Sequence, residues 1–292
     1  MTETVRDRAA RLIARGLAFP EGPLFDAQGD LWCVEMQGGG LARLDRAGRL
    51  TRFATGGAPN GLALDAAGGI WFCDSGQNSI RRLNPATGHC ETIVGSVDGR
   101  DLDKPNDLAF DAVGNLVFTC PGNSRETPTG YVCCLTPSGE CTVIADQLYF
   151  PNGLAFTGDG AMVIAETRRQ RLWRGGWDAG HRRWTSPTPL CATGGAPIGP
   201  DGLAIDIAGR LHVAIYGAGM VEVFDADGAR LGALTTPGAN PSNCAFDPTG
   251  ELGLVVTETE RGELLSFPAD AAGLPLALGA PPHSSAERAH VH

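Results

Sequence analysis

The chain has 292 residues, a formal net charge of −10 and a hydrophobic content of 42%. This content is too high for a disordered chain, and without a basic stripe we expect no nucleic-acid partner. Nine cysteines without CxxC spacing predict free thiols in a reducing, cytoplasmic compartment. No apolar run approaches the roughly 18 residues of a membrane span, so we also expect no membrane partner.

The first sixteen residues, MTETVRDRAARLIARG, mix charged and short apolar stretches. They lack the continuous apolar core of a secretory signal. Around residues 14–17 we expect an outer strand that pairs with the last repeated unit of the chain. Such pairing closes a ring of sheets and removes an exposed sheet edge.

From Phe19 onward the chain repeats one phrase six times: a proline loop, a short apolar strand, a Gly turn and a second apolar strand. The copies are FPEGPLFDAQGDLWCVE (19–35), APNGLALDAAGGIWFCD (58–74), KPNDLAFDAVGNLVFTC (104–120), FPNGLAFTGDGAMVIAE (150–166), GPDGLAIDIAGRLHVAI (199–215) and NPSNCAFDPTGELGLVVTE (240–258). They recur at about 40–50 residues, the length of one four-stranded propeller blade. We therefore predict an all-β fold, a six-bladed β-propeller with a central metal site, with residues 1–292 as one propeller domain.

The second copy shows how a blade is built. Residues 62–65 and 70–73 predict two inner strands, and the second is continuously apolar, as in a strand buried on both faces. Residues 80–83 and 91–94 predict two outer strands with more polar side chains. The first strand of each blade should line the central channel. After the last blade, residues 279–292, with His290 and His292, predict a flexible tail.

The residue after each proline carries a side-chain oxygen in all six copies. These residues are Glu21, Asn60, Asn106, Asn152, Asp201 and Ser242. Asn or Asp after Pro is also an ordinary turn residue, but Glu21 is a poor one, and equivalent positions of successive blades lie on one ring. Carboxylate and amide oxygens suit one divalent cation, Ca²⁺ best, with Mg²⁺, Mn²⁺, Zn²⁺ and Fe²⁺ as alternatives. A cation would also relieve the repulsion between two enclosed carboxylates.

A second column stands where each second strand ends. Its members are Glu35, Asp74, Cys120, Glu166, Ile215 and Glu258. Glu166, with two arginines close behind it, is a candidate substrate-binding residue, and a carboxylate that merely closes a strand into a loop is the equal alternative. Arg125 and Tyr216 are further candidates for contacting a polar ligand. We expect His212, within an apolar strand, to belong to the core.

The phrases FPEGP, KPND, FPNGLAF and GPDGLAID, in this order, resemble the SMP-30/gluconolactonase (regucalcin-like) family of six-bladed propellers. The resemblance runs from about residue 17 to residue 267. It implies that Glu21, Asn152 and Asp201 bind one divalent metal ion on the axis, and that Asn106 contributes to metal or substrate binding. It also implies hydrolysis of sugar lactones, with phosphotriesterase-type activity in some branches.

Two positions depart from the family pattern. Lys104 stands where the sugar-lactonase branch has an Arg, and an ammonium group does not reproduce the planar fork of a guanidinium. Cys120 stands where many relatives have an Asp, which removes a carboxylate from the pocket and puts a second metal site in doubt. Asn60 adds an amide to the ring. Lys104, Asn106 and Asn60 are therefore candidate substrate-binding residues.

Together these features predict a hydrolase that acts on carboxylic ester bonds, a lactonase for a small-molecule aldonolactone. The cation would polarise the lactone carbonyl, and Asp201 would both hold it and activate water as the catalytic residue. No GxSxG elbow is present, which fits a mechanism without a nucleophilic serine. The alternatives are a metal-dependent aryl-esterase or organophosphate hydrolase, and a binding propeller with a structural ion. We expect a monomer or a small homo-oligomer.

Overall fold

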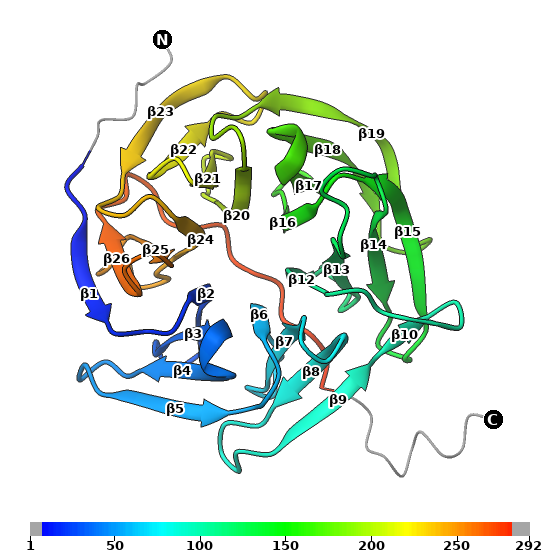
Figure 1. The fold of residues 1–292 in the computed structure, drawn as a ribbon, viewed down its shortest axis with the longest axis horizontal. Coiled ribbons are helices and arrows are strands. Elements are labelled where there is room, and N and C mark those ends of the chain that lie inside the picture. Colours follow the sequence, from blue (N-terminus) through cyan, green and yellow to red (C-terminus); the bar gives the residue numbers. More distant parts are fainter. Residues whose placement is uncertain (1–7, 282–292) are drawn as a thin grey trace.

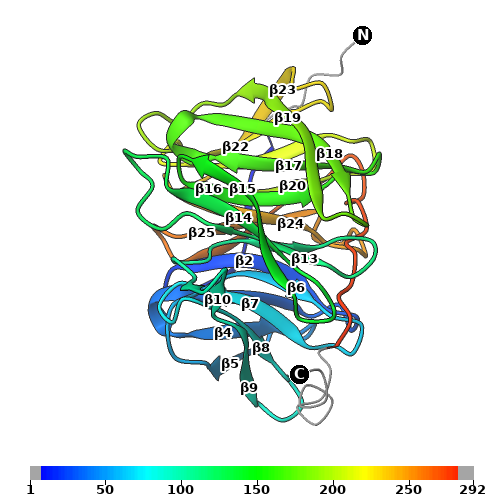
Figure 2. The same cartoon turned by 90° about the vertical axis from the view of Figure 1, so that its right-hand side faces the viewer.

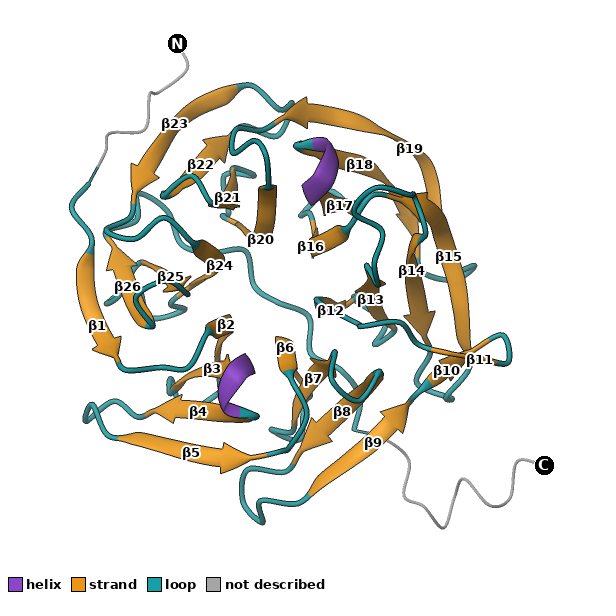
Figure 3. Ribbon diagram, viewed as in Figure 1, coloured by secondary structure: helices purple, strands orange, loops and turns teal. Residues whose placement is uncertain are grey.

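The structure is a computed structural model that describes residues 8–281. Six four-stranded sheets stand around a central axis (Figure 1), which confirms the six-bladed β-propeller. The innermost strands are β2, β6, β12, β16, β20 and β24, so the first strand of each blade lines the channel as predicted. Figure 3 shows that, in this part of the chain, helix is limited to two short turns, η1 (Met36–Gly38) and η2 (Thr167–Arg169).

The first three blades occupy the N-terminal half of the chain. Blade one holds β2 (Pro20–Phe25), β3 (Leu31–Glu35), β4 (Gly40–Leu44) and β5 (Leu50–Ala54). Blade two holds β6 (Pro59–Leu64), β7 (Ile70–Asp74), β8 (Ser79–Leu83) and β9 (Cys90–Val94). Blade three holds β12 (Leu108–Phe110), β13 (Leu116–Cys120), β14 (Gly130–Leu135) and β15 (Cys141–Leu148), after a small hairpin of β10 (Ser96–Val97) and β11 (Arg100–Asp101). All four strands expected for the second copy are present.

The other three blades complete the ring. Blade four holds β16 (Pro151–Phe156), β17 (Ala161–Glu166), β18 (Arg171–Asp178) and β19 (Arg183–Ala192). Blade five holds β20 (Gly199–Ile205), β21 (Leu211–Tyr216), β22 (Met220–Phe224) and β23 (Arg230–Thr235). Blade six holds β24 (Pro241–Phe246), β25 (Leu254–Glu258), β26 (Glu263–Phe267) and, on its outside, β1 (Arg11–Arg15). The pairing of β1 with β26 confirms the predicted closing strand.

The second strand of a blade is buried along almost its whole length. Every side chain of β3, β7, β13 and β17 is buried, as the continuous apolar runs predicted. Trp32, Phe72 and Phe118 belong to these strands and are fully buried in the apolar clusters that join neighbouring blades. Burial of such a side chain contributes about 1.5–3 kcal/mol to the free energy of folding. Packing between neighbouring blades therefore depends mainly on these strands.

A single side chain organises the turn between the first two strands of each blade. In blade two, Asp65 Oδ1 accepts hydrogen bonds from the backbone N–H of Ala67 (2.9 Å) and Gly69 (2.8 Å). The same role falls to Asp26, Asp111, Thr157, Asp206 and Asp247 in the other blades. A short oxygen-bearing side chain that bonds the backbone a few residues ahead favours a turn over continued strand.

Glycines in the proline loops bring the inner strands close together at the axis. A Cβ at Gly153 would lie 2.5 Å from the carbonyl oxygen of Asp201 in the next blade. A Cβ at Gly22 would lie 2.9 Å from the backbone nitrogen of Leu62. Because only glycine tolerates such contacts, the Gly of the PEG and PNG loops lets neighbouring proline loops meet around a narrow channel.

After β26 the chain crosses the channel as a strap, residues 268–281, on the far side of the view in Figure 1 and at the right edge of Figure 2. The strap bonds to blade five, where Leu274 N donates to Ile205 O (2.8 Å), and to blade two, where Gly279 N donates to Leu64 O (3.1 Å). Blades two and five stand opposite each other in a ring of six. The strap therefore ties the C-terminal ends of two facing inner strands.

This strap corrects one expectation. A flexible tail was predicted from residue 279 onward, yet Gly279 forms a bridge with Asp65 of blade two. The remainder of the predicted tail, including His290 and His292, lies outside the described residues.

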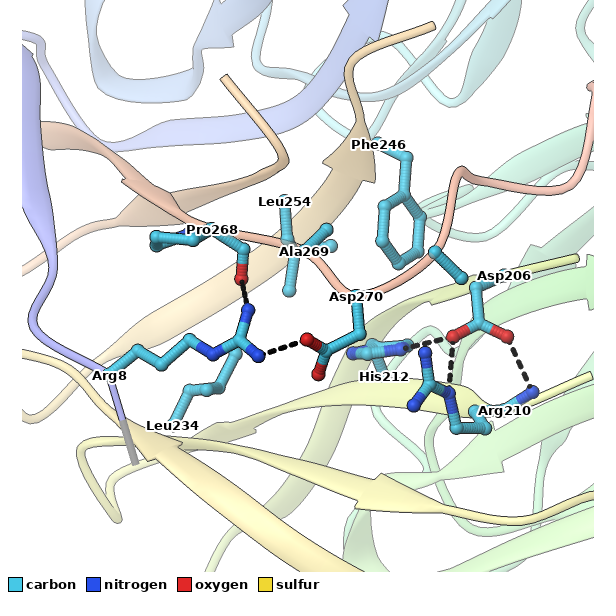
Figure 4. A pocket seen from close by; sticks show the side chains of 11 residues that line it. Arg8, Asp206, Arg210, His212, Leu234, Phe246, Leu254, Pro268, Ala269 and Asp270 are labelled. Carbon is cyan, nitrogen blue, oxygen red and sulfur yellow. Dashed lines mark hydrogen bonds and ion pairs between the residues drawn. The ribbon is translucent and has the colours of Figure 1, made fainter. Parts of the chain in front are cut away.

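Figure 4 shows a small pocket where the strap meets blades five and six. Asp270 of the strap forms an ion pair with Arg8. Beside it, Asp206 accepts a hydrogen bond from Arg210 Nε (2.6 Å) and lies 3.1 Å from His212 Nε2. His212 is buried, as expected. The ion pair between Arg8 and Asp270 anchors the strap on the face of the propeller opposite the proline loops.

All nine cysteines are free thiols, as predicted. In the described part of the chain, no helix has the length and apolar character needed to cross a membrane.

Candidate metal centre and active site

The oxygen-bearing ring predicted from the repeats lies at the end of the channel opposite the strap. Its members are Glu21, Asn60, Asn152, Asp201 and Ser242, each near the start of an inner strand and buried, and Asn106, which precedes β12 and is half-buried. Because the inner strands converge on the axis (Figure 1), these positions form one circle around it. The residues that align in the six repeats thus form a ring in the folded protein.

Charges within this ring act on one another. Burial raises the pKa of Glu21 well above its usual range, and the nearby carboxylates of Asp201 and Asp107 raise it further. Burial and the charge of Asp107 likewise raise the pKa of Asp201, while a hydrogen bond from the Asn152 amide acts in the opposite direction. Three carboxyl groups and one amide therefore share an enclosed space. Like charges confined in this way repel each other strongly.

Asp107 was not expected at the axis. Burial raises its pKa to about 6, although hydrogen bonds from the Leu108 backbone and the Asn243 amide oppose the shift. The Leu108 N–H donates to Asp107 Oδ1 at 2.8 Å. A Cβ placed on Gly61 of blade two would lie 2.2 Å from the same oxygen, so Asp107 lies directly over that glycine.

Asn243 occupies the matching position in blade six, opposite blade three in the ring. Its Oδ1 accepts a hydrogen bond from the Cys244 N–H (2.8 Å), and it lies over Gly202 of blade five as Asp107 lies over Gly61. The signal for this pair was in the repeats. One position beyond the oxygen column, four copies have Gly and the third and sixth have Asp107 and Asn243.

A positive φ immediately before the proline distinguishes four blades from the other two. The residue before the proline has a left-handed φ in the blades of Glu21, Asn106, Asn152 and Asp201. These residues are Phe19 (φ 62°), Lys104 (φ 50°), Phe150 (φ 58°) and Gly199 (φ 130°). Residues before proline normally adopt extended conformations, and unusual backbone angles cluster at functional sites. The positive φ thus coincides with the four residues predicted to bind metal, and it is strained at Phe19, Lys104 and Phe150 but not at Gly199.

Asn60 and Ser242, in the two other blades, have partners of their own. The Asn60 amide nitrogen lies 3.8 Å from Met36 Sδ in η1. The Ser242 hydroxyl donates to the backbone oxygen of Pro20 at 3.1 Å and lies 2.9 Å from Thr257 Oγ1. Ser242 thus joins blade six to blade one, while Asn60 borders the entrance beside η1.

The second column of carboxylates holds the loops in place. Glu166 is 1% exposed, and its carboxylate accepts hydrogen bonds from the Tyr149 N–H (2.7 Å), Arg171 Nε (2.6 Å) and Trp173 Nε1 (2.7 Å). The other carboxylates, Glu35, Asp74 and Glu258, likewise accept backbone N–H groups of the loops that lead into their blades' inner strands. Because both of its oxygens accept protein donors, Glu166 supports the loop before Asn152.

Two candidates for binding a polar substrate remain, Tyr216 and Arg125. Tyr216 lies near the ring, since burial raises its pKa and the charges of Asp201 and Glu21 add to that rise. Arg125 is exposed, and its guanidinium carbon lies 5.5 Å from the centre of the Phe150 ring.

Both departures from the family pattern are outside the ring. Lys104 is exposed, and its Nζ donates to Asn123 Oδ1 at 2.8 Å. Cys120 is fully buried in the apolar cluster between blades two and three.

The chemistry of the ring fits a hard divalent cation. Glu21, Asn152 and Asp201 supply carboxylate and amide oxygens, the donors that Ca²⁺ and Mg²⁺ prefer. Among residues 8–281 no group of three or more His, Cys, Asp or Glu side chains is arranged to hold a metal ion. A cation in this ring must therefore draw on amide oxygens as well as carboxylates, and it would offset the repulsion among Glu21, Asp107 and Asp201.

The chain is similar to a known protein family and to several characterised proteins. The model of the SMP-30/Gluconolactonase/LRE-like region matches residues 19–260. The diisopropyl-fluorophosphatase of Loligo vulgaris is 28% identical over 280 residues, which cover 85% of this chain and 88% of that protein. The gluconolactonase of Zymomonas mobilis is 30% identical over 212 residues, covering 66% of this chain and 58% of that protein. The solved structure of the gluconolactonase XC5397 from Xanthomonas campestris superposes with a TM-score of 0.80 at 27% identity, over 91% of both chains.

Proposed function

The chain belongs to the SMP-30/gluconolactonase/LRE-like family, and from this premise we propose that it is a hydrolase that opens a lactone to its hydroxy acid with one divalent cation. Relatives named gluconolactonase and pentonolactonase support this reaction. A sugar lactone of the aldonolactone type is the substrate that we infer. Ca²⁺ is the first candidate for the cation, with Mg²⁺, Mn²⁺, Zn²⁺ and Fe²⁺ to be compared.

One observation carries the proposal: Glu21, Asn152 and Asp201 meet at the axis, in blades whose backbone has a positive φ immediately before the proline. We assign these three residues to the cation and keep Asn106 as a further ligand or substrate contact. When bound, a divalent cation supplies Lewis acidity toward a carbonyl oxygen. Glu21, Asn152 and Asp201 are buried, and burial strengthens the electrostatic interactions among their side chains.

The protein's own carboxylates account for the proton movements. Hydrolysis joins the oxygen of water to the carbonyl carbon, breaks the ring C–O bond, and moves one proton from water to the departing alkoxide oxygen. We propose Asp201 as the residue that takes this proton. Asp107 is a second candidate, because its pKa of about 6 lies near neutral pH, where a carboxylate can both accept and return a proton.

The test is a pH-stat assay on aldonolactones. We expect hydrolysis that is lost after treatment with EDTA and restored by a divalent cation. Asp201→Asn should lower kcat/KM by about 10³-fold, since it removes a proposed ligand and proton acceptor together. The matched control, Asp227→Asn, alters an exposed carboxylate and should leave the rate unchanged. Activity that survives complete removal of metal would contradict the proposal.

A second candidate function has specific support. The Loligo vulgaris relative is named for the hydrolysis of a fluorophosphate, and its match covers most of both chains. Rates on a sugar lactone, an aryl ester and diisopropyl fluorophosphate, measured side by side on one preparation, separate the two activities. A higher kcat/KM for the fluorophosphate would transfer the proposal to phosphorus chemistry at the same ring. Metal binding without turnover of any of the three would favour a binding propeller.

A further inference from the structure

Three arginines surround the segment that leads into Asn152. We call Arg125, Arg168 and Arg169 the arginine rim. Arg125 and Arg169 are exposed and Arg168 is half-buried. Across residues 8–281, no carboxylate lies within ion-pair distance of any of the three. Three guanidinium groups without an ion pair are thus gathered in one place on a chain whose net charge is −10.

The rim adjoins the proposed metal ring through short contacts. The dipeptide Tyr149–Phe150 comes directly before Pro151 and Asn152, so it lies about 7–10 Å along the chain from the ring. The Phe150 N–H donates to Ser124 Oγ (2.9 Å), next to Arg125. Across the dipeptide, the Asn152 amide donates to Thr167 Oγ1 (3.2 Å), next to Arg168. The arginine rim therefore lies beside blade four at the end of the central channel that holds the proposed metal ring.

Two of the guanidinium groups are pre-positioned by aromatic rings. The guanidinium carbon of Arg169 lies 3.7 Å from the centre of the Tyr149 ring, and that of Arg125 lies 5.5 Å from the centre of the Phe150 ring. Stacking on an aromatic face leaves the edge N–H donors of arginine free for another partner.

The third guanidinium extends the rim toward blade five. Arg168 Nη1 donates to the backbone oxygen of Pro197 at 3.1 Å, in the loop that leads to Asp201. Figure 3 shows η2, which carries Arg168 and Arg169, close to the inner ends of β16 and β20. The rim thus borders both Asn152 and Asp201.

Other arginines of the same face are already neutralised. Arg52 pairs with Glu35 (2.6 Å), Arg81 with Asp74 (2.9 Å) and Arg171 with Glu166 (2.6 Å). These are the carboxylates that hold the loops, so the usual role of an arginine here is internal. The three rim arginines have no such carboxylate partner among residues 8–281.

We propose that the arginine rim binds an oxyanion that the substrate carries away from its ester, so that the preferred lactone is an anionic sugar lactone. A carboxylate or a phosphate would present the same oxygen acceptors to the guanidinium edges. This inference rests on the proposed lactonase function and names its substrate class. The gluconolactone of the named relative carries no such charge, so the rim predicts a different preference within one family.

The substrate series tests the charge directly. We propose measuring kcat/KM at low salt for D-glucono-1,5-lactone, for 6-phospho-D-glucono-1,5-lactone and for D-glucaro-1,4-lactone, which are neutral, phosphorylated and carboxylated. We expect about a tenfold higher kcat/KM for at least one anionic lactone, and this advantage should shrink as salt is raised. A preference between the two anionic lactones identifies the oxyanion, and either result supports the rim.

The variants separate the rim from the ring. Arg168→Gln combined with Arg169→Gln should remove most of the anionic advantage and leave the rate on neutral lactone unchanged. Arg168→Lys combined with Arg169→Lys, which keeps the charge, should retain part of it. The matched control, Arg183→Gln, changes an exposed arginine of β19 that has no carboxylate partner within residues 8–281. It should behave as the unmodified protein does.

Two failures can be told apart. If no lactone of the series is hydrolysed, the proposed function is wrong, and the rim has no substrate to select. If neutral lactone is hydrolysed as well as both anionic ones, and the double Gln variant changes neither rate nor salt dependence, the inference about the rim is overturned while the lactonase stands.

Discussion

In five of the six blades a single aspartate determines the geometry of the inner turn, and Asp65 is one of the most fully bonded of them. Its carboxylate is buried, accepts two backbone N–H groups, and also accepts hydrogen bonds from Trp71 Nε1 (2.8 Å) and Arg82 Nε (2.6 Å). Burial alone would raise the pKa of Asp65, but the hydrogen bonds from Arg82 and Trp71 outweigh it, and the pKa lies below its usual value.

This lowered pKa gives a signed prediction. A carboxyl group with a depressed pKa in the folded state stabilises the protein above its unfolded pKa of about 3.9 and loses that effect as pH falls through the folded value. Asp65→Asn should therefore cost about 2 kcal/mol in the free energy of unfolding at pH 7, and the cost should shrink below about pH 4. Urea unfolding from pH 3 to 7 measures it, with Asp227→Asn as the exposed control. A cost that is the same at pH 3 and pH 7 would refute the role of the charge.

At the level of residues, the repeats predicted the ring but not all its members. The proposed ligands stand out in the sequence because they occupy the same position of different repeats. These residues are Glu21, Asn152 and Asp201. Asp107 was missed because its neighbour Asn106 already filled the column, and a single repeat does not show that the next position also points to the axis. The role of Glu166 depended on Tyr149 and Trp173, which only the folded chain brings to its carboxylate.

Among the elements, the strap is one that sequence patterns did not reveal. Its segment is rich in Ala, Gly and Pro and shows no strand periodicity. It is held by backbone hydrogen bonds to Leu64 and Ile205, which belong to facing blades, and by the packing of its glycines on aromatic rings. A Cβ at Gly279 would lie 2.1 Å from Phe110, and one at Gly273 would lie 2.3 Å from Phe246 Cβ. Because these contacts reach facing blades, they can form only when the six blades have closed into a ring.

The strap predicts a sharp steric effect. Gly279→Ala places a methyl group against the Phe110 ring and should displace the strap from blade two, which costs about 1–3 kcal/mol. Gly95→Ala is the control, because a Cβ there has no neighbour closer than 3.9 Å. Thermal unfolding measures both, and hydrogen exchange at the Ala66 amide, which donates to Gly279 O at 2.9 Å, reports the strap alone. Equal melting temperatures and equal protection of that amide would show that the strap does not stabilise the ring.

Across the whole molecule, ring closure rests on several independent ties. The outer strand β1 joins the first and last parts of the described chain by pairing with β26, and the strap joins blades two and five. The ring of Glu21, Asn152 and Asp201 would add a third tie, because a cation held there joins blades one, four and five. In its absence the mutual repulsion of Glu21, Asp107 and Asp201 opposes the closed ring.

The cation should therefore stabilise the fold as well as serve catalysis. A ligand that binds only the folded state adds about 2.7 kcal/mol at a hundred times its Kd, and each kcal/mol raises the Tm of a chain of this size by about 2 °C. We expect the Tm to rise with the logarithm of Ca²⁺ concentration and to fall after EDTA. Asn152→Ala should weaken this dependence, because its amide lies beside Asp201.

Asn60→Ala is the matched amide variant. Since its side chain lies against Met36 rather than beside the carboxylates, the dependence of Tm on Ca²⁺ should persist in it. Metal content measured on the same samples separates lost binding from lost stability. If Asn60→Ala abolishes the dependence and Asn152→Ala preserves it, the ring binds its cation on the side of blade two, and the assignment of ligands to blades one, four and five is wrong.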